Sequence, residues 1–222
     1  MKKFSSVSKR MKIFWRRLIR DERGISSVEF VIVATVFFML IFGIIDFSRA
    51  MWEWNAAAKA TQFGARYAVV SDIVSIDYKD FSGLSIGLNA GDKVPIKNSG
   101  GNDIIAPIFC SDGDPGAGLA IGCGTSLGGL AAAKADAVAF LAIVTMMQKM
   151  YDRIEAHNVV IEYRHIGLGF AGNPVGPDVD PLVTVKLRDM TFDFVTPGLV
   201  GIFTLNMPDF AASLTGEDHV TI

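Results

Sequence analysis

The chain has 222 residues, of which half are hydrophobic, with a mean hydropathy of +0.37 and a formal net charge of −2. This is apolar for a soluble protein of its length, and the excess is unevenly spread, which favours a membrane segment plus one globular domain of ordinary size. Nine of the 21 cations but only two of the 23 anions precede Ile25, so residues 1–24 carry +7 and the rest of the chain −9. A nucleic-acid-binding arm is disfavoured, because this basic stub stands directly before a membrane-length apolar run.

The apolar run extends from Ile25 to Ile45 and contains one ionisable residue, Glu29. As a helix it would span about 31 Å, which matches the hydrocarbon core of a bilayer. We therefore predict a basic cytoplasmic leader over residues 1–24 and a transmembrane helix over residues 25–46. The positive-inside rule then places everything after Asp46 outside the cytoplasm.

The predicted helix does not stop at the membrane. Residues 47–70 contain no proline, and small or apolar residues recur in them at spacings of three and four, as in a helix with one packed face. Trp52 and Trp54 stand where an interfacial aromatic belt is expected. We predict a helix extension over 47–70, followed by a periplasmic domain over 71–222.

The outer domain is predicted to be α+β. Turn-forming residues dominate from Ser71 to Ser126, and a second helix is expected from Leu127 to His157. Strands are expected at 94–96, 104–109, 159–166, 182–188 and 190–195. The fold class is therefore a long N-terminal transmembrane helix that extends into a domain of one packed helix and antiparallel strands.

Two cysteines, Cys110 and Cys123, lie in the Gly-rich part of this domain. An even number of cysteines on the outer side of a membrane favours a disulfide, and two unpaired thiols are the alternative. A metal site is disfavoured, because the pair has neither CxxC spacing nor a histidine close by in the sequence.

Glu29 is the residue that membrane anchoring alone does not explain. An acidic side chain well inside a membrane helix costs ~2.5–3.5 kcal/mol, and less near the helix end. Two explanations remain open: the carboxylate reaches the lipid headgroups, or it pairs with a cation in an assembly of such helices.

The string Arg23-Gly-Ile-Ser-Ser-Val-Glu-Phe30 resembles the type IV prepilin signal. In that family a basic leader ends in Gly and is removed by a prepilin peptidase, and the fifth residue after the cut is Glu. Gly24, Ile25 and Glu29 match this pattern position by position. The resemblance implies cleavage between Gly24 and Ile25, and pairing of Glu29 with the new amine of a neighbouring subunit.

A wider stretch resembles the TadE-like pseudopilins of the tight-adherence (Flp) branch. It comprises Gly24-Ile-Ser-Ser-Val-Glu-Phe-Val-Ile-Val, Ile44-Ile-Asp-Phe-Ser-Arg49 and Gly64-Ala-Arg-Tyr-Ala68. The resemblance covers residues 22–70, whereas the Gly-rich insert around Cys110 and Cys123 is outside the shared pattern. The neighbouring TadF- and TadG-like groups therefore remain alternatives.

The resemblance implies a minor pilin-like subunit in the bacterial inner membrane, with incorporation into a pilus. Its implied partners are other pilin or pseudopilin subunits, the prepilin peptidase, the inner-membrane pilus assembly platform and membrane lipid. Neither a nucleic acid nor a cofactor is expected, and no enzymatic activity. The alternative is an uncleaved, signal-anchored envelope protein with a partner-binding periplasmic domain.

Other patterns in the domain do not indicate a catalytic or metal site. Gly167-Leu-Gly-Phe-Ala-Gly172 spells GxGxxG, but the Asn173-Pro174 that follows is incompatible with the helix that a dinucleotide site requires. His157, His165 and His219 are scattered along the sequence, and no paired-carboxylate or Ser-His-Asp arrangement stands out.

Overall fold

The computed structural model describes residues 25–113, 120–125, 134–169, 179–195 and 204–216. The leader, including Gly24 of the predicted cleavage site, lies outside the described residues. The described residues fall into two compact units, one with residues 25–49 and 194–195 and the other with the described residues of 50–193 and 204–216.

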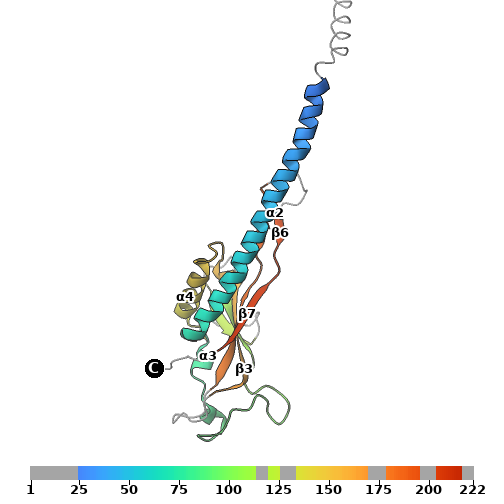
Figure 1. Ribbon diagram of the computed structural model, residues 1–222. Helices are drawn as coiled ribbons and strands as arrows, with labels where there is room; N and C mark the ends of the chain where they lie inside the picture. The colour runs from blue at the N-terminus through green and yellow to red at the C-terminus, as the bar shows by residue number, and fades with distance from the viewer. Residues whose placement is uncertain (1–24, 114–119, 126–133, 170–178, 196–203, 217–222) are drawn as a thin grey trace, which may run out of the picture. The chain divides into compact units, whose positions relative to one another are not determined.

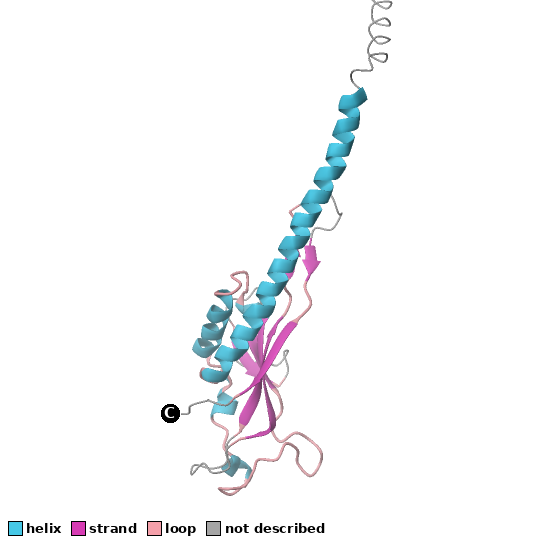
Figure 2. Cartoon of the chain, in the orientation of Figure 1, coloured by secondary structure: helices cyan, strands magenta, loops and turns pink. Residues whose placement is uncertain are grey.

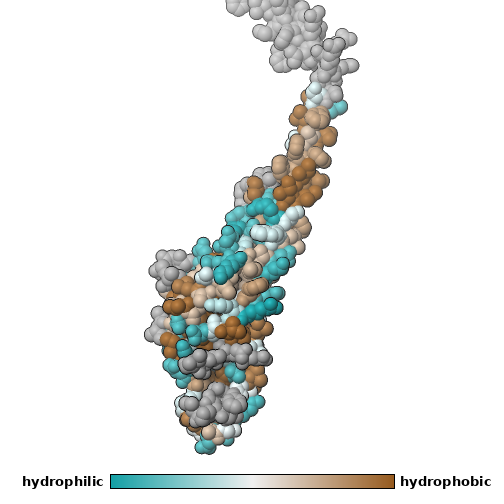
Figure 3. Space-filling model, turned by 60° about the vertical axis from the view of Figure 1, so that its left-hand side comes forward, coloured by the Kyte–Doolittle hydropathy of each residue, from teal (hydrophilic) through white to brown (hydrophobic). Residues whose placement is uncertain are grey.

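A single helix, α2 (Ile25–Val70), contributes to both units (Figure 1). In the first unit its apolar side chains are exposed or half-exposed from Val28 to Ile45, and the visible face of this segment is hydrophobic in Figure 3. A helix that is apolar all round needs a lipid or protein environment. Within the described part of the chain, α2 is the one helix long and apolar enough to cross a membrane.

The second unit is built on a five-stranded sheet in the order β2-β1-β3-β4-β7, with every neighbouring pair antiparallel. The strands are β1 (Ile108–Asp112), β2 (Ile121–Gly124), β3 (Val159–Leu168), β4 (Asp180–Leu187) and β7 (Phe210–Thr215). A separate two-stranded sheet pairs β5 (Thr191–Asp193) with β6 (Thr204–Asn206). The predicted α+β class is confirmed.

The core of this unit lies between one face of the sheet and two helices, the domain part of α2 and α4 (Ala137–Gln148) (Figure 2). Small residues of α2 make a close approach possible. At Gly64 a β-carbon would come within 2.7 Å of the Met147 side chain of α4 and 3.4 Å of Val185 in β4. Gly64 therefore marks the point where both helices and the sheet meet.

The predicted helix over 127–157 is too long. Residues 126–133 are outside the described part of the chain, and α4 begins only at Ala137, because the Asp136 side chain accepts hydrogen bonds from the backbone N–H groups of Val138 and Ala139. The helix ends at Gln148, whose side chain donates to the Ile154 carbonyl and closes the following turn.

The strand predictions are right in the alternating C-terminal segments, whereas the strand predicted at 104–109 is displaced, because β1 begins only at Ile108. β3, β4 and β5 form where strands were expected. The predicted strand at 94–96 is absent, although Ile104 donates to the Ile96 carbonyl in a short hairpin-like turn. Neither β2, whose residues are Ile-Gly-Cys-Gly, nor β7 was predicted. The structure also contains three short helical elements. Two of them lie in the segment predicted as loop: α3 (Ile76–Lys79), capped by Ser75, and the 3₁₀ turn Gly83–Ile86. The third, the 3₁₀ turn Ala156–Asn158, lies at the end of the predicted helix over 127–157.

Candidate functional site

The N-terminal end of α2 carries the residues of the predicted processing and assembly site. As described, the helix begins at Ile25, and Glu29 follows one helical turn later. The Glu29 side chain is exposed, and none of the described residues forms an ion pair with it. An exposed carboxylate beside an apolar run is suited to bind a cation supplied by another molecule.

Further along, α2 is tied to its domain by a buried carboxylate. Glu53 is 6% exposed, and its Oε2 atom accepts hydrogen bonds from the Tyr151 hydroxyl at 2.9 Å and from Arg153 Nη1 at 2.8 Å. Arg153 Nη2 also lies 3.5 Å from Asp193 in β5. Burial, together with the hydrogen bond and the charge of Glu53, raises the pKa of Tyr151 to about 12. This cluster could not be predicted from local sequence patterns, because Glu53 lies about a hundred positions from Tyr151 and Arg153.

The side of α2 that faces away from the sheet exposes large apolar groups. Met51, Trp52 and Phe63 are exposed among polar neighbours. Trp54, expected in an interfacial belt beside Trp52, remains 40% exposed and lies edge-on to the Phe210 ring of β7 with ring centroids 5.1 Å apart. Exposed aromatic and Met side chains on a helix are typical of surfaces that pack against other chains.

Cys110 and Cys123 are joined by a disulfide. They are directly paired residues of β1 and β2. Asp112 stabilises the same hairpin, because its Oδ1 atom accepts a hydrogen bond of 2.8 Å from the backbone N–H of Ala120. The bond therefore crosslinks the short, Gly-rich edge strand to its neighbour.

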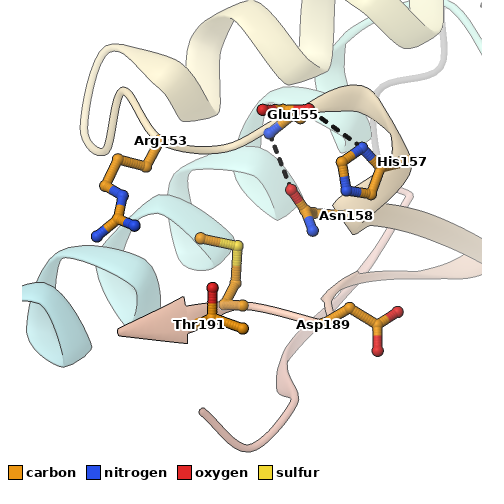
Figure 4. Close-up of a pocket in the computed structure, with 7 residues that line it drawn as sticks. Arg153, Glu155, His157, Asn158, Asp189 and Thr191 are labelled. Carbon is orange, nitrogen blue, oxygen red and sulfur yellow. Dashed lines mark hydrogen bonds and ion pairs between the residues drawn. The ribbon is translucent and has the colours of Figure 1, made fainter. Parts of the chain in front are cut away.

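A surface hollow of about 270 Å³ lies between the turn before β3 and the start of β5 (Figure 4). In Figure 4 the Glu155 carboxylate contacts His157 Nδ1, at 3.3 Å, and the Asn158 side-chain oxygen accepts from the Glu155 backbone N–H. The Asn158 amide also donates to the Arg188 carbonyl. These polar groups are used to close the turn, so the hollow is explained as part of the fold.

The remaining patterns from the sequence do not converge on one place. His165 is buried in β3, His157 lies in the turn before that strand, and His219 is outside the described residues. Gly167 and Gly169 have positive φ values at the end of β3, and residues 170–178 of the GxGxxG segment are not described. Among the described residues no group of three or more His, Cys, Asp or Glu could hold a metal ion.

Comparison with known proteins adds one finding to this geometry. No curated protein and no solved structure matches the chain. Residues 24–66 match the model of one protein family. The matched segment includes the predicted processing site, the apolar run and the part of α2 up to Arg66. That family is described as TadE-like protein, so residues 24–66 are similar to TadE-like proteins.

Proposed function

We propose that the chain is a pilin-like minor subunit, a pseudopilin, of a tight-adherence pilus. A prepilin peptidase removes residues 1–24 by cutting between Gly24 and Ile25. The helix that follows is held in the inner membrane, with the α+β domain in the periplasm. In the assembled state the Glu29 carboxylate pairs with the Ile25 amine of a neighbouring subunit.

The observation that carries this proposal is the coincidence of the TadE-like match with Glu29 on α2. The match begins at Gly24, the residue that the cleavage pattern requires. Glu29 is ionisable and sits in a helix that is otherwise apolar through Ile45. Pairing with an amine would offset the cost of holding its carboxylate in the membrane.

The proposal gives the chain an assembly role and no catalytic one. Its partners are other pilin or pseudopilin subunits, the prepilin peptidase, the assembly platform of the inner membrane and the surrounding lipid. Neither a cofactor nor a nucleic acid takes part. The exposed side of α2, with Met51, Trp52 and Phe63, is suited to contact neighbouring helices.

The pairing is tested by replacing Glu29 in cells that build the pilus. Glu29→Gln removes the charge but keeps the shape, so we expect normal membrane insertion, normal processing and loss of the subunit from sheared pilus fractions. Glu29→Asp is the matched control that keeps the charge, and it should retain part of the incorporation. The readout is the ratio of pilus-bound to membrane-bound protein on immunoblots.

The same experiment distinguishes the proposed pseudopilin from the alternative, an uncleaved envelope protein with a partner-binding domain. For such a protein, Glu29→Gln would only make the span more apolar, with no effect on partners of the domain. Incorporation of the Gln variant at the wild-type level would therefore contradict the proposed pairing.

A further inference from the structure

Asp46 ends the apolar run of α2, and the structure uses it to hold a distant part of the chain. Its side chain is only 3% exposed. The Oδ1 atom lies 3.3 Å from Arg49 Nη1 and also accepts a hydrogen bond of 3.3 Å from the backbone N–H of Val195. Asp46 and Val195 belong to the same compact unit. A residue 149 positions further along the sequence is thus fixed at the turn of helix where the apolar run ends.

The side chains at this turn are apolar and open to the surroundings. Val195 is 67% exposed, and Phe47, the residue after Asp46, is 66% exposed. No ionisable residue occurs between Asp193 and Asp209 in the sequence. Entry of Val195 into an apolar phase would therefore not require desolvation of a charge close to it in sequence.

We propose that Phe47 and Val195 form an interfacial collar, a second lipid contact at the periplasmic end of the span. Its partner is the bilayer at the boundary between headgroups and acyl chains. Aromatic and aliphatic groups bind there when a polar group beside them remains at the headgroup level. Arg49, whose side chain is 41% exposed and contacts the buried Asp46 carboxylate, is that polar group.

This inference rests on the proposed membrane anchoring, because the collar would contact lipid only if the apolar run of α2 spans the bilayer. The collar continues directly from the apolar run, so lipid that surrounds Ile45 also reaches Phe47, two residues later along the same helix. Its role would be to set the depth at which the span ends while the subunit waits in the membrane.

The collar is tested by site-specific fluorescence of the full-length protein in vesicles of phosphatidylcholine and phosphatidylglycerol. Because Cys110 and Cys123 are disulfide-bonded and are the chain's two cysteines, an added cysteine is the one reactive thiol of the oxidised protein. Val195→Cys is labelled with an environment-sensitive dye, as are Phe37→Cys in the span and Lys93→Cys in an exposed polar segment. Lipids with a nitroxide at shallow or deep positions then report the depth of each dye.

We expect a blue-shifted emission from the dye at 195, quenched more strongly by the shallow nitroxide than by the deep one. The dye at 37 should respond more to the deep nitroxide, and the dye at 93 to neither. A dye at 195 that behaves like the one at 93, while the dye at 37 is quenched, would overturn the collar and leave the span intact. Lack of quenching at 37 as well would overturn the membrane anchor itself.

Blue-shifted emission at 195 without any lipid quenching would also overturn the collar, since it indicates that protein covers the residue.

The role of Asp46 is tested in the Val195→Cys background. Asp46→Ala should reduce the shallow quenching, whereas Asp46→Asn, which keeps an acceptor oxygen, should retain it. If both variants show the same shallow quenching as the Val195→Cys protein that keeps Asp46, Asp46 does not hold Val195 in place.

Discussion

Glu53 shows how a single buried charge can connect α2 with the sheet domain. Glu53 belongs to the second compact unit, and its partners Tyr151 and Arg153 lie in the turn after α4. A buried carboxylate needs partners, because an unpaired charge in this environment is costly. The turn that ends α4 early is thereby explained: it brings Tyr151 and Arg153 to Glu53.

Replacement of Arg153 by Met should destabilise the domain without creating a cavity in its hydrophobic core. The variant leaves Glu53 with fewer hydrogen bonds, and since the Arg153 side chain is 41% exposed we expect a loss of only about 1–2 kcal/mol in unfolding free energy. Urea unfolding of the full-length protein in detergent, followed by Trp fluorescence, measures it. Combined with Glu53→Gln, the loss should be smaller than the sum of the two single losses, and a strictly additive result would contradict a direct interaction.

Three buried tyrosines predict a loss of stability at alkaline pH. Burial raises the pKa of Tyr78 and Tyr163 above the ordinary value of 10.0, and burial with the Glu53 contact raises that of Tyr151 to about 12. The unfolded chain therefore releases these protons at lower pH than the folded chain. Their contribution is fully present below pH 10 and is lost as the pH rises from 10 toward 12 and beyond.

Tyr78 offers a matched control for this pH dependence. Its hydroxyl is buried and has no hydrogen-bond partner among the described residues, so Tyr78→Phe should not lower stability at pH 7. Urea unfolding at pH 7 and pH 10.5 should show a smaller alkaline loss in the variant than in the wild type. An identical loss in both proteins would indicate that Tyr78 does not contribute.

At the scale of elements, α2 combines a lipid-compatible surface with a packed one. In the domain it buries Ala57, Ala60, Ala65 and Ala68, and Gly64 allows the closest approach to α4. The two glycines of α2 differ sharply in surroundings. A β-carbon at Gly64 would meet Met147 at 2.7 Å, whereas nothing lies within 4 Å of one at Gly43.

This difference predicts opposite effects for the same substitution. Gly64→Leu forces a large side chain between α2, α4 and β4, so we expect a loss of about 3 kcal/mol or failure of the domain to fold. Gly43→Leu adds an apolar group to the exposed part of the helix and should leave domain stability unchanged. Thermal unfolding of the detergent-solubilised proteins by circular dichroism distinguishes the two. Similar melting temperatures for both variants would contradict the packing described for Gly64.

The sequence predicted α2 and the alternating strands well, because their patterns depend on local periodicity. It could not predict β2 or β7, in which Gly, Ala and Ser carry little strand preference and pairing with β1 and β4 decides the conformation. The helix predicted over 127–157 is too long because its C-terminal part contains Tyr151 and Arg153, which lie in a turn and contact Glu53. Such a long-range contact leaves no local pattern in the sequence. Glu29 was recognisable because a charge in an apolar run conflicts with its surroundings.

For the whole molecule, the most informative feature is the division of charge at Gly24. Residues 1–24 carry +7 and the remainder −9, so removal of the leader would change the net charge from −2 to −9. Under the proposed function, the basic leader would supply the positive charge that orients the span during insertion. On the proposed account, the leader would no longer be needed after insertion, and its removal would free the Ile25 amine for pairing with Glu29.

The most direct test of this account is the intact mass of the protein from membranes of cells with a prepilin peptidase, compared with otherwise identical cells lacking it. We predict loss of residues 1–24 only where the peptidase is present, and a full-length chain for Gly24→Val in both strains. A full-length wild-type chain in both strains would contradict the pilin-like account and would indicate an uncleaved, signal-anchored envelope protein.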